Sequence, residues 1–156
     1  MKIEKGQQAP AFILHNTEKK EVSLKEQQGK NVLLLFFPLA FTGVCTKELC
    51  SIRDNIAIYN TANATVFGIS VDSPQTLNKF KEEQGLNFTL LSDFNKEASA
   101  AYDALYDSFA GWMKGVSKRS AFIIDKQGII QYAEILENAG ELPNFDAIQE
   151  ILKNLK

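Results

Sequence analysis

Apolar residues follow two different periods along the chain, and the change of period predicts alternating strands and helices. Residues 32–37 are continuously apolar, which is typical of a strand that is covered by helices on both faces, and residues 65–71 predict a second buried strand. Between these strands, apolar side chains recur at intervals of three, four and three residues, at Leu49, Ile52, Ile56 and Tyr59. This spacing predicts one helix that starts near Gly43–Cys45 and carries all four side chains on one face.

Three further helices are predicted in the second half of the chain. The first spans 74–84, because Ser73 is a favourable N-cap, Pro74 suits the first helical position and Gly85 suits the residue after a helix. A short strand over 88–91 precedes a helix over 96–105, and the last helix runs from about 145 to 155. Apolar residues at helical spacing are expected to face inward in the two later helices: Ala98, Ala101, Tyr102 and Leu105, then Phe145, Ile148, Ile151, Leu152 and Leu155.

Two antiparallel hairpins complete the predicted sheet. Residues 11–14 and 21–24 flank a polar turn, and residues 121–124 and 129–135 flank the turn Asp125-Lys126-Gln127-Gly128. Combined with the alternation of strands and helices, this predicts a three-layer α/β sandwich with a mixed β-sheet and an N-terminal β-hairpin. The chain contains no internal repeat or linker-like tract, so we expect a single domain over residues 1–156.

Composition excludes several classes of function. Of 156 residues, 45% are hydrophobic and 23% are charged, and the net charge of −2 is too balanced for a nucleic-acid or polybasic membrane binder. The longest apolar run, 32–40, is too short to span a membrane and contains Pro38. Because no apolar segment follows the charged start, we expect no secretory signal and a cytoplasmic location. Two cysteines and one histidine do not make a usual zinc site, and we expect no metal or cofactor.

The residues that suggest chemistry form the pattern Pro38-x-x-x-Thr42-x-x-Cys45. This pattern ends the first central strand and opens the next helix, where unpaired backbone N–H groups and the helix dipole favour an anion. Thiols in such positions, especially beside a cation, are commonly nucleophilic thiolates. Thr42 is close enough to direct its hydroxyl at the sulfur or at a substrate oxygen, and Pro38 would stiffen the loop. The alternative is that Cys45 is an inert core residue on the apolar stripe.

These residues resemble the peroxiredoxins, thioredoxin-fold enzymes that reduce hydroperoxides at a cysteine in this motif. The resemblance extends through Gly-Ile-Ser-Val-Asp (68–72) and Leu-Asn-Phe-Thr-Leu-Leu-Ser-Asp (86–93) to Lys-Arg-Ser-Ala-Phe-Ile-Ile-Asp (118–125). It implies a thioredoxin-like fold in which Arg119 is the active-site arginine and reaches Cys45. It also implies that Glu48 holds this arginine in place, whereas on its own Glu48 is equally consistent with a glutamate that favours the start of a helix.

The expected mechanism begins with the Cys45 thiolate, which attacks the peroxide and becomes a sulfenic acid. Cys50 is a candidate resolving residue. In an intact helix, two residues five apart have Cα atoms roughly 8.6 Å apart, whereas a disulfide needs less than about 7 Å. The hypothesis is therefore that residues 45–50 unwind locally so that Cys50 can attack the Cys45 sulfenic acid. If Cys50 is only a core residue, an external thiol must resolve Cys45.

Two branches of the family share features with this chain. The C-x-x-x-x-C spacing resembles the bacterioferritin-comigratory branch, which implies recycling by thioredoxin-type donors, whereas residues 36–43 resemble the one-cysteine alkyl hydroperoxide reductase E branch. If Cys50 does not resolve Cys45, the external thiol would be a donor such as glutaredoxin. The alternatives are a thioredoxin-like disulfide exchanger, which would be expected to use C-x-x-C, and a redox-sensing domain without turnover. The chain is expected to be a monomer or a homodimer, and Trp112, Arg53 and His15 have no assigned role.

Overall fold

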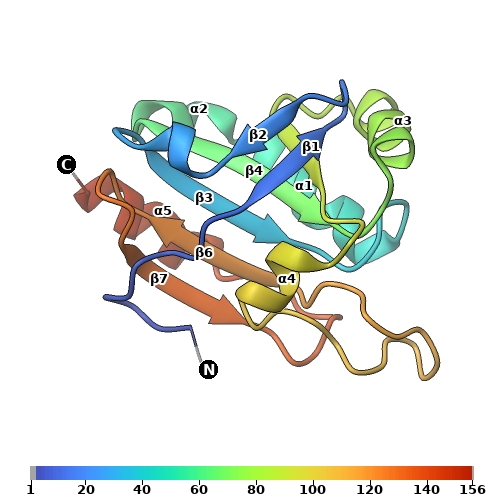
Figure 1. Ribbon diagram of the computed structural model, residues 1–156. Coiled ribbons are helices and arrows are strands. Elements are labelled where there is room, and N and C mark those ends of the chain that lie inside the picture. Colours follow the sequence, from blue (N-terminus) through green and yellow to red (C-terminus); the bar gives the residue numbers. More distant parts are fainter. Residues whose placement is uncertain (1–2, 156) are drawn as a thin grey trace.

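A seven-stranded mixed β-sheet organises residues 3–155, the part of the chain that the computed structural model describes. Its strand order is β2-β1-β5-β4-β3-β6-β7 (Figure 1). The strands are β1 (Ile13–Asn16), β2 (Glu21–Ser23), β3 (Asn31–Phe36), β4 (Ala64–Ser70), β5 (Thr89–Ser92), β6 (Ser120–Ile124) and β7 (Ile130–Ile135). The helices are α1 (Gly43–Asp54), α2 (Ile56–Thr61), α3 (Pro74–Gln84), α4 (Glu97–Ala101) and α5 (Phe145–Asn154), with a 3-10 turn at Lys25–Gln27. Within residues 3–155, none of the helices has the length and apolar character needed to cross a bilayer.

The sheet combines a parallel centre with antiparallel edges, which confirms the predicted mixed sheet and both hairpins. Strands β3, β4 and β5 are parallel, whereas β6 runs antiparallel to β3. The hairpin β1–β2 pairs with β5, and the hairpin β6–β7 forms the opposite edge. In this register Phe36 at the end of β3 is paired with Ser120 at the start of β6. The segment after β3 and the segment before β6 therefore meet at one end of the sheet.

Strand β3 separates two cores, because all six of its residues are buried and successive side chains point to opposite faces. Leu33 and Leu35 pack in one core with residues of α1, α2, α3 and α5. Leu34 and Phe36 pack in the other core with α4, Tyr102 and the N-terminal segment. Figure 1 shows α4 in front of the sheet and α5 behind it. The predicted three-layer α/β architecture is confirmed.

The boundaries of α3 agree with those read from its flanking residues. The Ser73 hydroxyl accepts a hydrogen bond from the Thr76 N–H, Pro74 is the first helical residue, and Gly85 ends the helix with φ +60°. All three signals act over four residues or fewer, so they do not depend on the rest of the fold.

The predicted helix from Gly43 through Tyr59 is wrong in one respect, because it is interrupted at Asn55. Asn55 leaves helical geometry with φ −118° and ψ 20°, and its side-chain amide donates to the Ser51 carbonyl at 2.8 Å. This side-chain bond takes over one of the carbonyls left free at the end of α1. The apolar period continues across the interruption into α2, so periodicity could not reveal it.

The predicted helix over 96–105 is also wrong in its extent, because α4 covers only Glu97–Ala101. Its start is set by the buried Asp93 carboxylate, which accepts from the N–H groups of Ala98 and Ser99 at 3.1 and 2.6 Å. The helix ends because Asp103 adopts φ +55°. Ala101, which was expected to face inward, is exposed.

Gly68 in the centre of β4 offers a test of how tightly this core is packed. A Cβ at this position would lie 2.7 Å from Cδ2 of Leu90 and 3.4 Å from ring atoms of Phe37 and Phe88. Because overpacking of this kind strains the core, Gly68→Ala should lower the free energy of unfolding by roughly 1–3 kcal/mol, measured by urea denaturation. Gly43→Ala is the matched control, since a Cβ there meets no atom within 4 Å. Equal stability of the two variants would contradict the packing described.

Candidate active site

Cys45 is the third residue of α1, immediately beyond the loop that leaves β3. Its side chain is fully buried. The N–H groups of the first helical turn have no partner within the helix and form the positive end of its dipole. The thiol therefore lies where backbone geometry favours a negative charge, at the end of the sheet where β3 and β4 finish.

The loop before Cys45 is held in a fixed shape by a residue that the sequence analysis did not single out. The Asp72 carboxylate accepts from the Ala40 N–H at 2.8 Å and from the Ser70 hydroxyl at 2.6 Å. Phe41 adopts φ +65°, a strained conformation for a non-glycine residue. Its ring packs on that of Phe80, with the ring centroids 5.1 Å apart. The sequence signals for Asp72 were its position directly after a buried strand and its place at the end of the matched segment 68–72.

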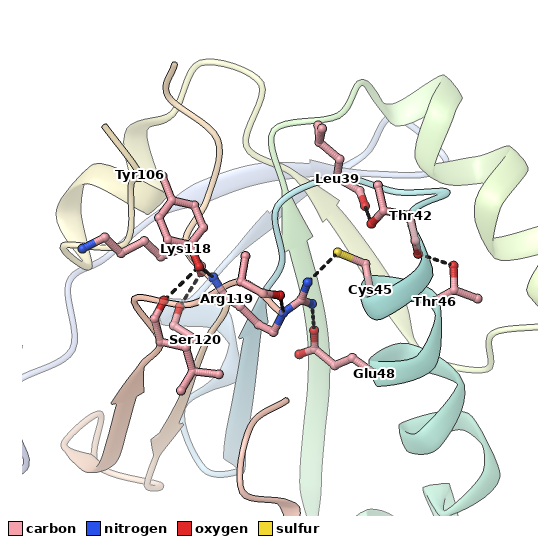
Figure 2. Close-up of polar contacts among 11 residues, drawn as sticks. Leu39, Thr42, Cys45, Thr46, Glu48, Tyr106, Lys118, Arg119 and Ser120 are labelled. Atoms are coloured by element: carbon pink, nitrogen blue, oxygen red, sulfur yellow. Dashed lines mark hydrogen bonds and ion pairs between the residues drawn. The ribbon is translucent and has the colours of Figure 1, made fainter. Parts of the chain in front are cut away.

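Arg119 reaches the thiol from the opposite side of the site, although 74 residues separate the two in sequence. Its guanidinium Nη2 donates to Sγ of Cys45 at 3.2 Å, and Nη1 donates to Oε1 of Glu48 at 2.6 Å. Nε donates to the Ala139 carbonyl at 2.9 Å, in the segment that follows β7. Figure 2 shows Cys45 and Glu48 projecting from α1 toward the extended Arg119 side chain. All three donor nitrogens are therefore engaged, and the guanidinium is fixed in one orientation.

The backbone of Arg119 is held as firmly as its side chain. Its carbonyl accepts from the Leu136 N–H at 2.9 Å, and its own N–H donates to the Tyr106 hydroxyl at 3.4 Å. That hydroxyl donates to the Leu136 carbonyl at 2.8 Å. Neither Tyr106 nor Ala139 was predicted, and the Ala139 contact uses a backbone carbonyl that any residue would supply.

Burial shapes the ionisation of the pair formed by Glu48 and Arg119. Burial raises the pKa of Glu48 to about 7, because desolvation outweighs the attraction of Arg119. Burial alone would lower the pKa of Arg119, but the neighbouring charges of Glu48 and Cys45 outweigh it and the pKa rises. Within the described residues, Oε2 of Glu48 is buried without a hydrogen-bond partner. The carboxylate is therefore poorly solvated, and the guanidinium keeps its charge.

Thr42 and Pro38 lie in the same loop. The Thr42 hydroxyl, which was expected to be directed at the sulfur or at a substrate oxygen, donates its proton to the Leu39 carbonyl at 2.8 Å. The Thr42 carbonyl accepts from the Thr46 hydroxyl at 2.8 Å. Pro38 is buried two residues after the end of β3. Both residues shape the loop that leads to Cys45.

Cys50 lies on α1 away from this cluster, and the two cysteines are not joined. Its thiol is partly buried and lies 3.5 Å from the side-chain oxygen of Gln84, at the end of α3. Residues 45–50 are helical throughout. The helix must therefore open before the two sulfurs can bond. No group of three or more His, Cys, Asp or Glu side chains in residues 3–155 is arranged to hold a metal ion.

Comparison with known proteins identifies the class of this protein. The sequence matches the AhpC/TSA family over residues 5–133. It is 37% identical to peroxiredoxin Bcp of Escherichia coli over 83% of this chain and 84% of that protein. It is also 37% identical to alkyl hydroperoxide reductase E of Mycobacterium tuberculosis over 88% of each chain. The crystal structure of peroxidoxin BcpB from Mycobacterium tuberculosis matches with a TM-score of 0.86 at 26% identity, covering 99% of both chains.

The fold and these relatives define a peroxiredoxin, an enzyme that reduces peroxides. The chain belongs to the AhpC/TSA family. The predicted resemblance to both branches is confirmed, since a Bcp-type protein and an alkyl hydroperoxide reductase E match it equally well.

The raised pKa of Glu48 predicts a pH dependence of stability. Because the pKa is about 7 in the folded protein against an ordinary value of 4.5, the folded state binds this proton more tightly than the unfolded chain. The stabilisation is complete below about pH 4.5 and is lost as the pH rises through about 7. Relative to the uncharged Glu48→Gln, the wild type should therefore lose free energy of unfolding between about pH 5 and pH 8, measured by urea denaturation.

The exposed Glu83 supplies the control for this measurement, because its side chain is 49% exposed. The difference in the free energy of unfolding between the wild type and Glu83→Gln should not follow the trend expected for Glu48→Gln. If the free energies of unfolding of the wild type and Glu48→Gln differ by a constant amount across the same pH range, the pKa of Glu48 is not raised by burial.

Proposed function

We propose that this protein reduces hydrogen peroxide and organic hydroperoxides through Cys45. The observation that carries the proposal is the hydrogen bond from Arg119 Nη2 to Cys45 Sγ inside a buried site. An inert core cysteine has no need of a guanidinium, and burying that charge is costly unless it is paired. The Arg119 charge and the N–H groups at the start of α1 both favour the thiolate over the thiol.

In the proposed reaction, the Cys45 thiolate attacks one oxygen of the peroxide. A sulfur–oxygen bond forms, the oxygen–oxygen bond breaks, and the second oxygen leaves as hydroxide or alkoxide and takes up a proton. Arg119 and the N–H groups of the first helical turn stabilise the charge on the departing oxygen. Thr42 donates its own proton to the Leu39 carbonyl, so its oxygen is oriented to accept a hydrogen bond from the peroxide rather than to donate one.

The product of this step is a Cys45 sulfenic acid, which must be removed before more peroxide oxidises it to sulfinic acid. We assign this removal to Cys50, which lies on the same helix. Attack of Cys50 on the sulfenic sulfur gives an intramolecular disulfide and water once α1 has opened. A thioredoxin-type or glutaredoxin-type dithiol then reduces this disulfide and restores both thiols.

The role of Arg119 predicts a large effect on the first step. Because an electrostatic donor at a developing anion is worth a factor of about 10²–10³, Arg119→Gln should slow Cys45 oxidation by that factor. Cys45→Ser should abolish peroxide consumption. Stopped-flow measurements with hydrogen peroxide and with an organic hydroperoxide report both effects. Lys118→Gln removes the neighbouring cation, which pairs with Glu137 at 2.7 Å instead, and serves as the control. Equal rates for wild type and Arg119→Gln would contradict the proposal.

The resolving role of Cys50 predicts the mass of the product. After one equivalent of peroxide, the wild type should lose two hydrogens, because the disulfide forms within one chain. Cys50→Ser should instead gain one oxygen and react with a sulfenic-acid probe, as shown by intact-protein mass spectrometry. A wild-type protein that keeps the added oxygen would show that an external thiol performs the resolution.

A further inference from the structure

The C-terminal half of α1 is attached to the end of α3 by Arg53. Its guanidinium Nη1 donates to the Gln84 carbonyl, and its Nε donates to Asp54 at 2.9 Å. The Arg53 carbonyl accepts from the Asn87 side chain at 3.3 Å. Because the last carbonyls of a helix carry the negative end of its dipole, a cation is favoured there. Arg53 thus fixes α1 at a point only three residues beyond Cys50.

Gln84 contacts Cys50 as well as Arg53. The Cys50 thiol donates to the Gln84 side-chain oxygen at 3.5 Å, while the Gln84 backbone carbonyl accepts from Arg53. Cys50 and Arg53 therefore both contact Gln84, which fixes their positions relative to the end of α3. A glutamine amide offers an oxygen to a thiol and, after rotation, an N–H to a thiolate.

The two halves of α1 are attached to different parts of the molecule. The N-terminal half is connected to Arg119 through Cys45 and Glu48. The C-terminal half is connected to the end of α3 and the residues just after it. Oxidation of Cys45 changes the contact between its sulfur and Arg119. The attachment at Arg53 does not involve Cys45 and persists.

We propose that Arg53, together with Gln84, is a positioning element for the resolving step, which holds Cys50 in place while the N-terminal turn of α1 unwinds toward it. This proposal rests on the proposed function of Cys50. In the step concerned, the Cys50 sulfur bonds to the Cys45 sulfur and the Cys45 sulfur–oxygen bond breaks. The oxygen leaves with the Cys50 proton as water. Cys45 is reduced and Cys50 is oxidised, so no further oxidant or reductant is needed.

The test separates the two steps in time. Wild type, Arg53→Gln and Arg53→Lys receive one equivalent of hydrogen peroxide, and samples are quenched in acid and analysed by mass spectrometry. Because a hydrogen bond with a charged group is worth about a factor of ten, Arg53→Gln should slow the conversion of sulfenic acid to disulfide by about tenfold. The rate of Cys45 oxidation should not change, and Arg53→Lys should restore most of the lost rate. With excess peroxide, Arg53→Gln should accumulate more sulfinic acid.

A second pair of variants tests the contribution of Gln84. Gln84→Glu keeps the shape of the side chain but replaces the amide donor with a carboxylate, so it should slow disulfide formation more than Gln84→Met does. Lys79→Gln removes an exposed cation from the same helix, where it lies 3.9 Å from Glu83, and should match the wild type. Urea denaturation of each variant confirms that it is folded under the assay conditions.

The outcomes distinguish the two proposals. If the disulfide forms as fast in Arg53→Gln as in the wild type, the role of Arg53 is overturned and the role of Cys50 remains intact. The role of Arg53 is also overturned if disulfide formation slows equally in Arg53→Gln and Arg53→Lys, in proportion to their loss of free energy of unfolding. A purely structural role would have this effect. A wild-type protein that never forms the disulfide overturns both.

Discussion

The active site depends on one buried guanidinium. Arg119 is 2% exposed and cannot shed its charge, so the fold must supply acceptors for it in place of water. Three are present: the Cys45 sulfur, the Glu48 carboxylate and the Ala139 carbonyl. Two of these belong to α1 and one to the segment after β7. The charge that would activate the thiol therefore also ties together elements from both halves of the chain.

This arrangement places opposing demands on α1. The helix must be intact to present Cys45 and Glu48 to Arg119, yet it must open if Cys50 is to bond to Cys45. Isolated helices of this length are only marginally stable in water, so α1 depends on its tertiary contacts. Its polar contacts lie toward both ends of the helix, at Arg119 and at Arg53, and Leu49 and Ile52 pack in the core between them. If Cys50 resolves Cys45 as proposed, a change at Cys45 would weaken the first of these polar contacts and leave the second in place, so unwinding would be confined to the first turns.

Predictions from local sequence signals were correct where neighbouring residues alone supply the hydrogen-bond partners of the backbone. Helix α3 begins and ends where Ser73 and Gly85 indicate, because a cap acts within a single turn. The errors arose where a side-chain contact or a backbone angle overrides the apolar period. Asn55 interrupts the predicted helix without changing the spacing of its apolar residues, and α4 is set by the Asp93 carboxylate and the positive φ of Asp103.

The sequence by itself determined the layered α/β fold, the position of Cys45 between a strand and a helix, and the pairing of Cys45 with the distant Arg119. The last of these came from resemblance, because no local pattern connects residues 74 positions apart. Only the tertiary structure decided that Ala139 and Tyr106 hold Arg119, that Asp72 anchors the loop, and that Arg53 and Cys50 both contact Gln84 at the end of α3. These contacts join residues that lie far apart in the sequence, so they exist only once separate elements have packed together.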